Sequence, residues 1–111
     1  MCFNCTKILL TLFNDAKLGQ GYREGIYEET TRVNGFPAWE SSTGNAIWRS
    51  GSRWFFGTSI GSRSSGIRSK LGENSDCPDQ ISSWEVYKDG DWVDATSDDV
   101  AFECYVFKGN I

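Results

Sequence analysis

Hydrophobic and polar residues alternate along most of the chain in short runs separated by clusters of Gly and Ser. The clearest runs lie in residues 34–54, which contain Trp39, Trp48 and Trp54. A side-chain period of two residues is typical of strands joined by hairpins, whereas a helix would show a period of about 3.6. Because each Trp side chain can bury on the order of 200 Å², these three could form much of a small core.

The same pattern predicts strands on both sides of this stretch. We expect a first strand over residues 8–13, a loop over residues 17–21 and a half-exposed strand near a sheet edge over residues 25–31. Asn34-Gly35 has turn chemistry suited to positive φ, and Asp89-Gly90 lies between two aromatic-rich runs as the strongest hairpin signal. The chain is therefore predicted to run as a series of antiparallel hairpins.

A last strand is expected over residues 100–107, in a central position of the sheet. One face would carry Val100, Phe102, Cys104 and Val106, and the other Ala101, Glu103, Tyr105 and Phe107. We predict an all-β fold, a single antiparallel meander of about eight or nine short strands that closes into a small sandwich or barrel. The predicted core comprises Trp39, Trp48, Trp54, Trp84, Phe102, Cys104 and Val106.

Length and composition are typical of one compact β domain. We expect it to span residues 1–111, with an N-terminal strand and loop (residues 1–20) before a Trp-rich module (residues 21–106). Aromatic residues make up 14% of the chain, which argues against disorder. The net charge of −4 gives no reason to expect nucleic-acid binding. The absence of His excludes His-dependent triads, His zinc ligands and imidazole general bases.

The apolar run near the N-terminus bears on localisation. Residues 8–13 are only six in number, too few to span a bilayer and fewer than a signal peptide usually needs. Lys7 precedes them as a signal-peptide charge would, but no small-residue cleavage pattern follows. We expect no membrane insertion. Two compartments stay open: a secreted protein whose leader is missing from this sequence, which we favour, and a cytoplasmic protein.

Four cysteines allow several arrangements. Cys2 and Cys5 form a C-x-x-C, while Cys77 and Cys104 stand alone, 27 positions apart. We favour a disulfide between Cys77 and Cys104 that staples a long loop to the last strand. The alternatives are a four-thiolate zinc site, whose second half lacks the usual C-x-x-C, and a redox C-x-x-C, which lacks a βαβ context. We therefore expect no metal and no cofactor.

Acidic residues near the predicted hairpin also raise the question of calcium. Asp89, Asp91 and Asp94 lie close together in the sequence, but their spacing is not that of an EF-hand. We interpret them as turn-forming and solvated side chains.

Charge is divided unevenly along the second half of the chain. Residues 45–72 carry five basic side chains and no acidic one, whereas residues 73–111 carry ten acidic and two basic. In one interpretation the two segments pair across the sheet and neutralise each other. In the other, the Arg-rich segment binds an anionic ligand, such as a sulfated or sialylated glycan or a phosphate.

An ordered set of residues carries a family resemblance. The set is Gly25-x-Tyr27, Asn34-Gly35-x-Pro37-x-Trp39, Trp48-Arg49, Arg53-Trp54, Gly66-Ile67-Arg68-Ser69, Cys77-Pro78, Trp84-x-x-Tyr87, Trp92-Val93-Asp94 and Val100-x-x-x-Cys104. It resembles a small Trp-rich β module that occurs singly or repeated in many invertebrate and protist proteins, often beside extracellular or signalling domains. The resemblance covers roughly residues 21–106 and implies a β fold and a binding role. The Cys2-x-x-Cys5 motif and the single copy depart from this pattern.

These observations favour a non-catalytic binding module, most simply for carbohydrate and including acidic glycans, because aromatic faces stack on sugar C–H surfaces. The predicted ligand-binding residues are Trp92, Arg63, Arg68 and Asp91. Trp92 follows a predicted hairpin turn, and Arg63 lies in a Ser- and Gly-rich loop with too little apolar surface to be core. The alternative is a protein-interaction or structural module with an open strand edge, which could form a homo-oligomer. An enzyme that works through two carboxylates is a further alternative, which the size of the chain disfavours.

Overall fold

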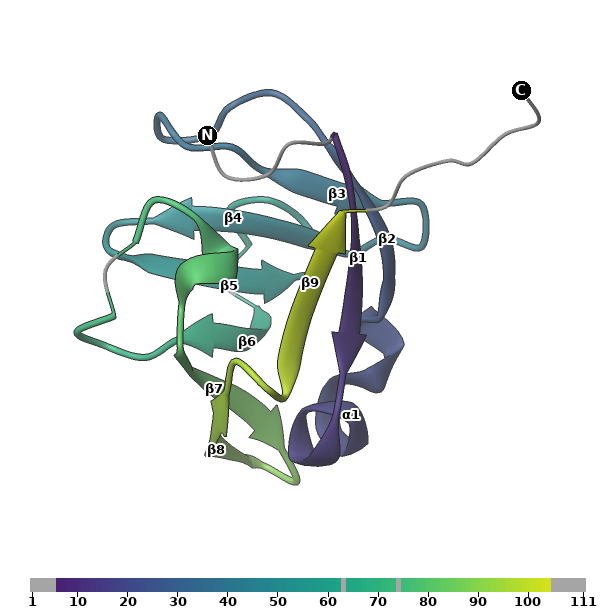
Figure 1. Ribbon diagram of the computed structural model, residues 1–111, viewed down its shortest axis with the longest axis vertical. Coiled ribbons are helices and arrows are strands. Elements are labelled where there is room, and N and C mark those ends of the chain that lie inside the picture. Colours follow the sequence, from purple (N-terminus) through teal and green to yellow (C-terminus); the bar gives the residue numbers. More distant parts are fainter. Residues whose placement is uncertain (1–5, 63, 74, 105–111) are drawn as a thin grey trace.

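The computed structural model describes residues 6–62, 64–73 and 75–104, and these form one nine-stranded antiparallel sheet with a short helix (Figure 1). The strands are β1 (Lys7–Leu12), β2 (Gly25–Glu29), β3 (Trp39–Ser41), β4 (Ala46–Ser50), β5 (Arg53–Gly57), β6 (Ser65–Ser69), β7 (Ser83–Lys88), β8 (Asp91–Thr96) and β9 (Val100–Cys104). Helix α1 (Asn14–Gln20) and the 3-10 turn η1 (Gly21–Arg23) connect β1 to β2, and a second 3-10 turn, η2 (Pro78–Gln80), precedes β7. The predicted all-β meander is confirmed.

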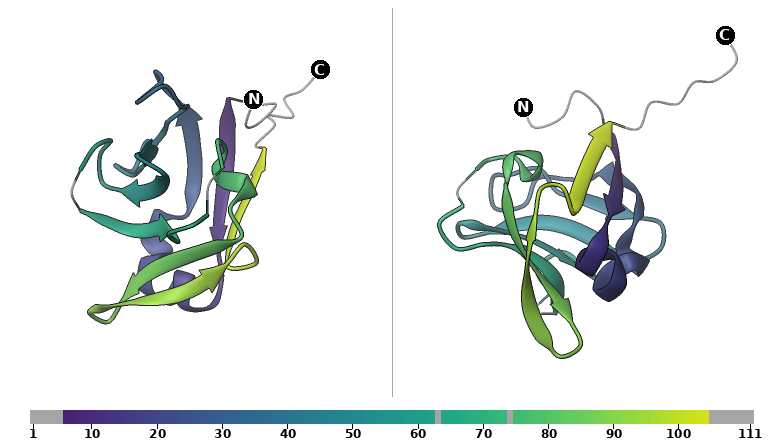
Figure 2. Two further views of the ribbon diagram at one scale, coloured as in Figure 1. Left: turned by 90° about the vertical axis from the view of Figure 1, so that its left-hand side faces the viewer. Right: turned by 60° about the horizontal axis from the view of Figure 1, so that its bottom comes forward.

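Strands β1 to β8 follow one another across the sheet in chain order, and β9 returns to pair with the free side of β1. The sheet curls into a half-barrel, which the two views of Figure 2 show from the side and from below. The curl brings β9 against strands that are distant from it in the sheet. The Phe102 ring lies 5.7 Å from that of Phe56 on β5 and 6.2 Å from that of Trp84 on β7, measured between centroids. These aromatic contacts join β9 to β5 and β7 across the interior and stabilise the curled shape of the sheet.

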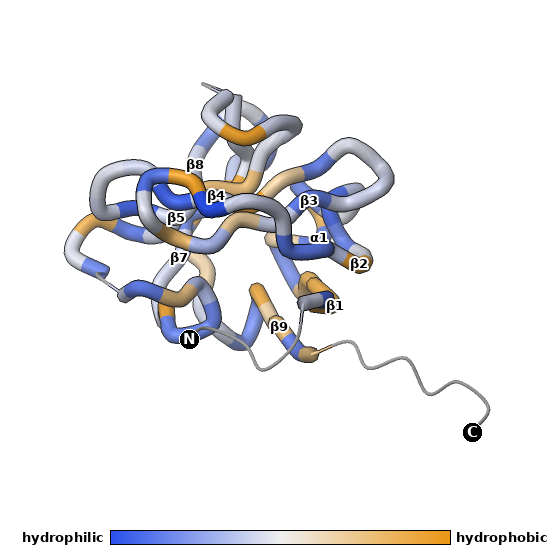
Figure 3. Tube along the Cα trace, turned by 90° about the horizontal axis from the view of Figure 1, so that it is seen from above, coloured by the Kyte–Doolittle hydropathy of each residue, from blue (hydrophilic) through white to orange (hydrophobic). Residues whose placement is uncertain are grey.

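The concave face of the sheet contains the core. Trp39, Trp54 and Trp84 are buried, as predicted, with at most 1% of each residue exposed. Phe102 packs against this core as a partly buried residue. Other core side chains alternate along the strands with outward ones, as the two-residue period requires. They include Ile8, Leu10, Leu12, Tyr27, Ile47, Phe56, Ile67, Val86 and Val100. Figure 3 shows hydrophobic stretches on β1 and β9, while the connecting loops are mostly hydrophilic or neutral.

Two predicted core residues lie elsewhere. Trp48 is buried, but it belongs to a second cluster with Ala38 and Ala46 rather than to the main core. Because neighbouring residues of a strand point to opposite faces, Ile47 takes the core position on β4 and directs Trp48 to the convex face. Cys104 is exposed at the end of β9.

The predicted positions of two strands within the sheet are wrong. Residues 25–31 were expected near an edge, but β2 lies between β1 and β3, and its two glutamates, Glu28 and Glu29, are exposed. The last strand was expected to be central, but β9 lies at one end of the strand order. Val100 and Phe102 do share the inner face, and Val106, Tyr105 and Phe107 lie outside the described residues. The first strand, β1, covers one side of β2, and β9 pairs with the other side of β1, so β9 and not β2 forms the end of the sheet.

The prediction of a loop over residues 17–21 is also wrong, because helix α1 and turn η1 occupy this segment. The helix packs against the end of β7 and closes one end of the half-barrel (Figure 1). Gly19 permits this approach, because a Cβ at this position would lie 2.8 Å from the Cβ of Lys88. The buried Gln20 side chain donates to the Tyr87 carbonyl at 2.8 Å, and its oxygen accepts from Arg23 Nε at 2.6 Å. Tertiary polar contacts stabilise a helix that has no apolar periodicity of its own.

The turn predicted at Asn34-Gly35 with positive φ and the hairpin turn predicted at Asp89-Gly90 are both confirmed. Asn34 and Gly35 have φ values of 55° and 83°, and Asp89 and Gly90 have 53° and 83°. Positive φ at both central residues is typical of a type I′ turn, whose twist matches that of the flanking strands. The first turn carries Asn34 to the convex face, where the candidate site lies.

Candidate functional site

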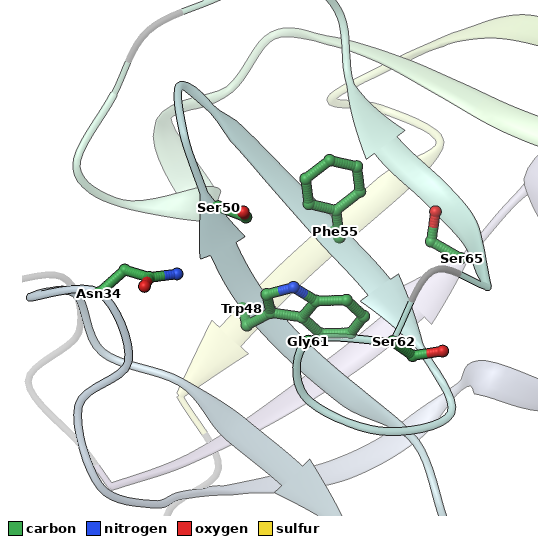
Figure 4. A pocket seen from close by; sticks show the side chains of 7 residues that line it. All are labelled: Asn34, Trp48, Ser50, Phe55, Gly61, Ser62 and Ser65. Atoms are coloured by element: carbon green, nitrogen blue, oxygen red, sulfur yellow. The ribbon is translucent and has the colours of Figure 1, made fainter.

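The convex face of the sheet carries a pocket with a volume of about 370 Å³. Its lining residues are Asn34, Trp48, Ser50, Phe55, Gly61, Ser62 and Ser65 (Figure 4). Asn34 comes from the connection between β2 and β3, and Gly61 and Ser62 come from the connection between β5 and β6. We call this site the aromatic pocket.

Two aromatic rings form the floor of the aromatic pocket. Trp48 and Phe55 are cross-strand partners on β4 and β5, and their rings are stacked with centroids 6.0 Å apart and planes inclined by 26°. Trp48 is almost fully buried, whereas Phe55 is half-buried and keeps surface open to the pocket. Gly57 makes room for the indole, because a Cβ there would lie 2.8 Å from Trp48 Cη2. The floor is therefore fixed by strand pairing and by one glycine.

Small polar side chains surround this floor, with Asn34 on one side of the rings and Ser62 and Ser65 on the other (Figure 4). Asn34 Nδ2 donates to the Arg49 carbonyl at 2.9 Å, which fixes the direction of the amide. Ser62 Oγ accepts from the Ser64 amide N–H at 3.0 Å. Hydroxyls donate and accept, and an amide does both through separate atoms. The site can therefore exchange hydrogen bonds with an uncharged polar ligand.

The sequence-predicted residues Arg68 and Trp92 lie together on the same convex face. The Arg68 guanidinium carbon is 3.8 Å from the centroid of the Trp92 ring, which also meets the Tyr87 ring edge-on at 5.4 Å. Trp92 is half-buried, so it is the most exposed of the five tryptophans, as expected. Arg68 is the cross-strand partner of Phe55, which places it beside the floor of the aromatic pocket.

The other two predicted ligand-binding residues do not join this group. Asp91 is exposed at the start of β8, where it pairs in register with Lys88. It directly precedes Trp92, so the two side chains start from opposite faces of the strand. Arg63 lies outside the described residues. The ligand-binding role of all four residues stays a prediction.

The described basic residues of the Arg-rich segment form ion pairs with the acidic C-terminal third. Both Arg53 Nη2 and Arg68 Nε donate to the same carboxylate oxygen of Glu85, at 2.7 and 2.8 Å. The other pairs are Arg49–Asp76 at 3.2 Å and Lys70–Asp94 at 3.1 Å. The interpretation that the two segments neutralise each other holds for these four residues.

Cys77 is buried before η2, and Cys104 ends β9; each is disulfide-bonded, and the described residues contain no free cysteine. The pairing of Cys77 with Cys104 stays a prediction, and Cys2 and Cys5 lie outside the described residues.

Over the described ranges, no group of three or more His, Cys, Asp or Glu could hold a metal ion. No helix in that part of the chain is long and apolar enough to cross a membrane.

The sequence reasoning missed the residues that line the aromatic pocket. Trp48 was assigned to the core, and Phe55 was not considered. A signal was present in the Ser50-Gly51-Ser52 turn, because a two-residue loop over positions 51 and 52 aligns Trp48 with Phe55 on one face. The serines gave no signal, since Ser is common in loops.

Comparison of the chain with protein-family models, with curated proteins and with solved structures found no match. The resemblance to a Trp-rich β module therefore stays a prediction, and the function is argued from the site.

Proposed function

We propose that this protein is a non-catalytic carbohydrate-binding domain whose ligand enters the aromatic pocket. The observation that carries the proposal is the combination of a Trp48–Phe55 floor with one amide and three hydroxyls around it. A sugar ring has C–H faces that pack on aromatic rings and hydroxyls at its edge that exchange hydrogen bonds with small polar groups. Both halves of that chemistry occur in this one pocket.

The position of the pocket on rigid elements supports the same proposal. Trp48 and Phe55 lie on adjacent strands in the middle of the sheet, and Asn34 is held by a type I′ turn and by its bond to the Arg49 carbonyl. A preorganised site loses little conformational entropy when a ligand binds. The β5–β6 loop that forms one wall is rich in Ser and Gly, so polar groups there can contact a sugar without disturbing the core.

A glycan array followed by titration calorimetry tests this function. The wild-type protein should bind at least one class of glycan reproducibly, and Phe55→Ala should weaken that binding tenfold or more through loss of the stacking surface. Ile26→Ala is the matched control, because Ile26 is also a partly exposed apolar residue on the convex face but lies on β2. A clean array, or equal loss in both variants, would contradict the proposal.

The alternative function as a protein-interaction module is supported by the ends of the sheet. Among the described residues, β8 pairs only with β7 and β9 pairs only with β1, so each has one side without a strand partner. Such an edge can accept a strand from another chain. A clean glycan array together with a concentration-dependent dimer in sedimentation experiments would favour this alternative.

A further inference from the structure

We infer that the aromatic pocket takes a neutral, hydroxyl-rich sugar of one or two rings and does not select acidic glycans. The inference rests on the proposed carbohydrate-binding function and specifies its ligand class. It departs from the expectation that arginines of residues 45–72 bind a sulfate or carboxylate group of the ligand. Three features of the site carry it: its lining, the direction of one amide, and the state of the neighbouring cations.

The described lining contains no charged side chain. It consists of two aromatic rings, one amide, three serines and one glycine. A sulfate or carboxylate that enters such a site loses hydration and meets no opposite charge among the described lining residues. A neutral sugar loses only hydroxyl hydration, which the serines and the amide can replace. The desolvation balance therefore favours the neutral ligand.

The Asn34 amide adds a directional preference. Its Nδ2 donates to the Arg49 carbonyl, while no described residue donates to its Oδ1. Oδ1 is an acceptor and needs a donor, which a sugar hydroxyl or an acetamido N–H can supply. An ionised sulfate or carboxylate offers only acceptor oxygens to it. The free acceptor of this amide is thus matched to a hydroxyl or N–H of the ligand and gives no added affinity for a sulfate or carboxylate group.

The described arginines beside the floor, Arg68 and Arg53, are already engaged in ion pairs. Arg68, beside Phe55, donates to Glu85 and stacks on Trp92, and Arg53 shares the same Glu85 oxygen. An anionic ligand would have to compete with a carboxylate held at 2.7 and 2.8 Å by these two arginines. Binding of an anion would therefore require breaking existing charge-assisted hydrogen bonds.

The size of the pocket limits the ligand. Its volume of about 370 Å³ is close to the lower end of the range for small-molecule sites, which is about 300–1,000 Å³. That space suits one or two sugar rings and not a longer stretch of polymer. Ser50, Ser62 and Ser65 supply hydroxyls at the edge of such a ring, where neighbouring sugar hydroxyls lie.

The test compares neutral with sulfated and sialylated glycans on one array and then measures Kd for the best of each by calorimetry, in 50 and 500 mM NaCl. We expect a neutral glycan to bind, with a Kd that changes less than twofold between the two salt concentrations, because an uncharged ligand has no ion pair to screen. Phe55→Ala should weaken this binding at least tenfold, and Ser65→Ala three- to tenfold. Arg63→Ala and Arg68→Ala should leave it within twofold for the folded fraction, which circular dichroism measures.

Asn34→Asp separates the two ligand classes most directly. Asp tolerates the positive φ of this position and keeps an acceptor, but it loses the bond to the Arg49 carbonyl, so binding of a neutral sugar should fall, by less than tenfold. Binding of an acidic glycan would fall much further, because the new carboxylate repels it. Exclusive binding of acidic glycans, lost in Arg63→Ala or in high salt, would overturn the neutral-sugar inference while carbohydrate binding stands. Failure of every glycan to bind would overturn both proposals.

Discussion

Replacing Arg68 by Ala is expected to lower the free energy of unfolding by about 1.5–3 kcal/mol, which is large for a residue on the outer face. Its side chain makes two separate interactions. Nε donates to Glu85 at 2.8 Å, and both side chains are less than a third exposed, at 28% and 21%. A hydrogen bond to a charged group contributes about 1.5–3 kcal/mol. The guanidinium also lies 3.8 Å from the Trp92 ring centroid, and such a cation–π contact contributes about 0.5–1 kcal/mol at an exposed site.

The two contributions do not simply add, because Glu85 keeps a second partner. Arg53 Nη2 still donates to the same oxygen at 2.7 Å after Arg68 is removed, so the carboxylate is not left bare. This retained bond offsets part of the loss and sets the lower end of the range. Arg68→Lys should cost about 1 kcal/mol, because it keeps the charge but loses the planar group that stacks on Trp92.

Urea unfolding followed by far-UV circular dichroism measures these differences. Arg32→Ala is the matched control: Arg32 is exposed and its guanidinium bonds the Gly35 carbonyl, so its loss should stay within about 0.5 kcal/mol. A double-mutant cycle of Arg68→Ala with Trp92→Ala should give a coupling energy of about 0.5–1 kcal/mol. If Arg68→Ala lowered the free energy of unfolding no more than the control does, the ion pair would contribute nothing measurable to stability. Arg68 would then be available as a ligand-binding residue.

Three further predictions concern Gly57, Glu73 and the two cysteines of the described residues. Gly57→Ala should cost about 1–3 kcal/mol in urea unfolding and disturb the aromatic pocket, because the added Cβ would lie 2.5 Å from the Ser64 carbonyl oxygen and 2.8 Å from Trp48 Cη2; an unchanged fold and unchanged sugar binding would contradict this. The pKa of Glu73 is held below its usual 4.5 by hydrogen bonds from the Ser82 hydroxyl and from backbone N–H groups, so its stabilising contribution is present above about pH 4.5 and lost as pH falls through the lower folded value. Glu73→Gln should therefore flatten the acid side of the Tm–pH curve, and an unaltered slope would refute it. Non-reducing peptide mapping should recover Cys77 and Cys104 in one cross-linked peptide, and reduction should lower stability by about 3 kcal/mol; a different partner for either cysteine would show that the predicted pairing is wrong.

The strands were predictable because their information is local. The two-residue period and the Asn-Gly and Asp-Gly turns are read from neighbouring residues, and the structure has both turns at positive φ. Helix α1 was missed because its stability depends on contacts far along the chain, such as the bond from Gln20 to the Tyr87 carbonyl. The edge position of β9 was missed for the same reason, since nothing local to the last strand indicates that it pairs with β1.

The candidate site was only half predictable, for a related reason. Arg68 and Trp92 were selected as separate residues from charge and turn position, and the structure brings them into contact. The pocket itself requires three segments to meet: the turn at Asn34, the β4–β5 hairpin and the loop after β5. Sequence spacing gives no distance between such segments, because their separation depends on how the sheet curls. Ser and Gly in those loops are typical of any turn, so they carried no information about a site.

The β4–β5 turn connects the fold to the site through strand register. Gly51 has φ 63°, and the two-residue loop that it opens pairs Trp48 with Phe55 and Arg49 with Trp54. Trp54 thereby faces the core while Trp48, one step away on the partner strand, faces the pocket. A register shift of one residue would move every side chain of one strand to the opposite face. Such a shift of β5 would expel Trp54 from the core and remove Phe55 from the pocket at the same time. The main core therefore enforces the geometry of the aromatic pocket, although their side chains lie on opposite faces of the sheet.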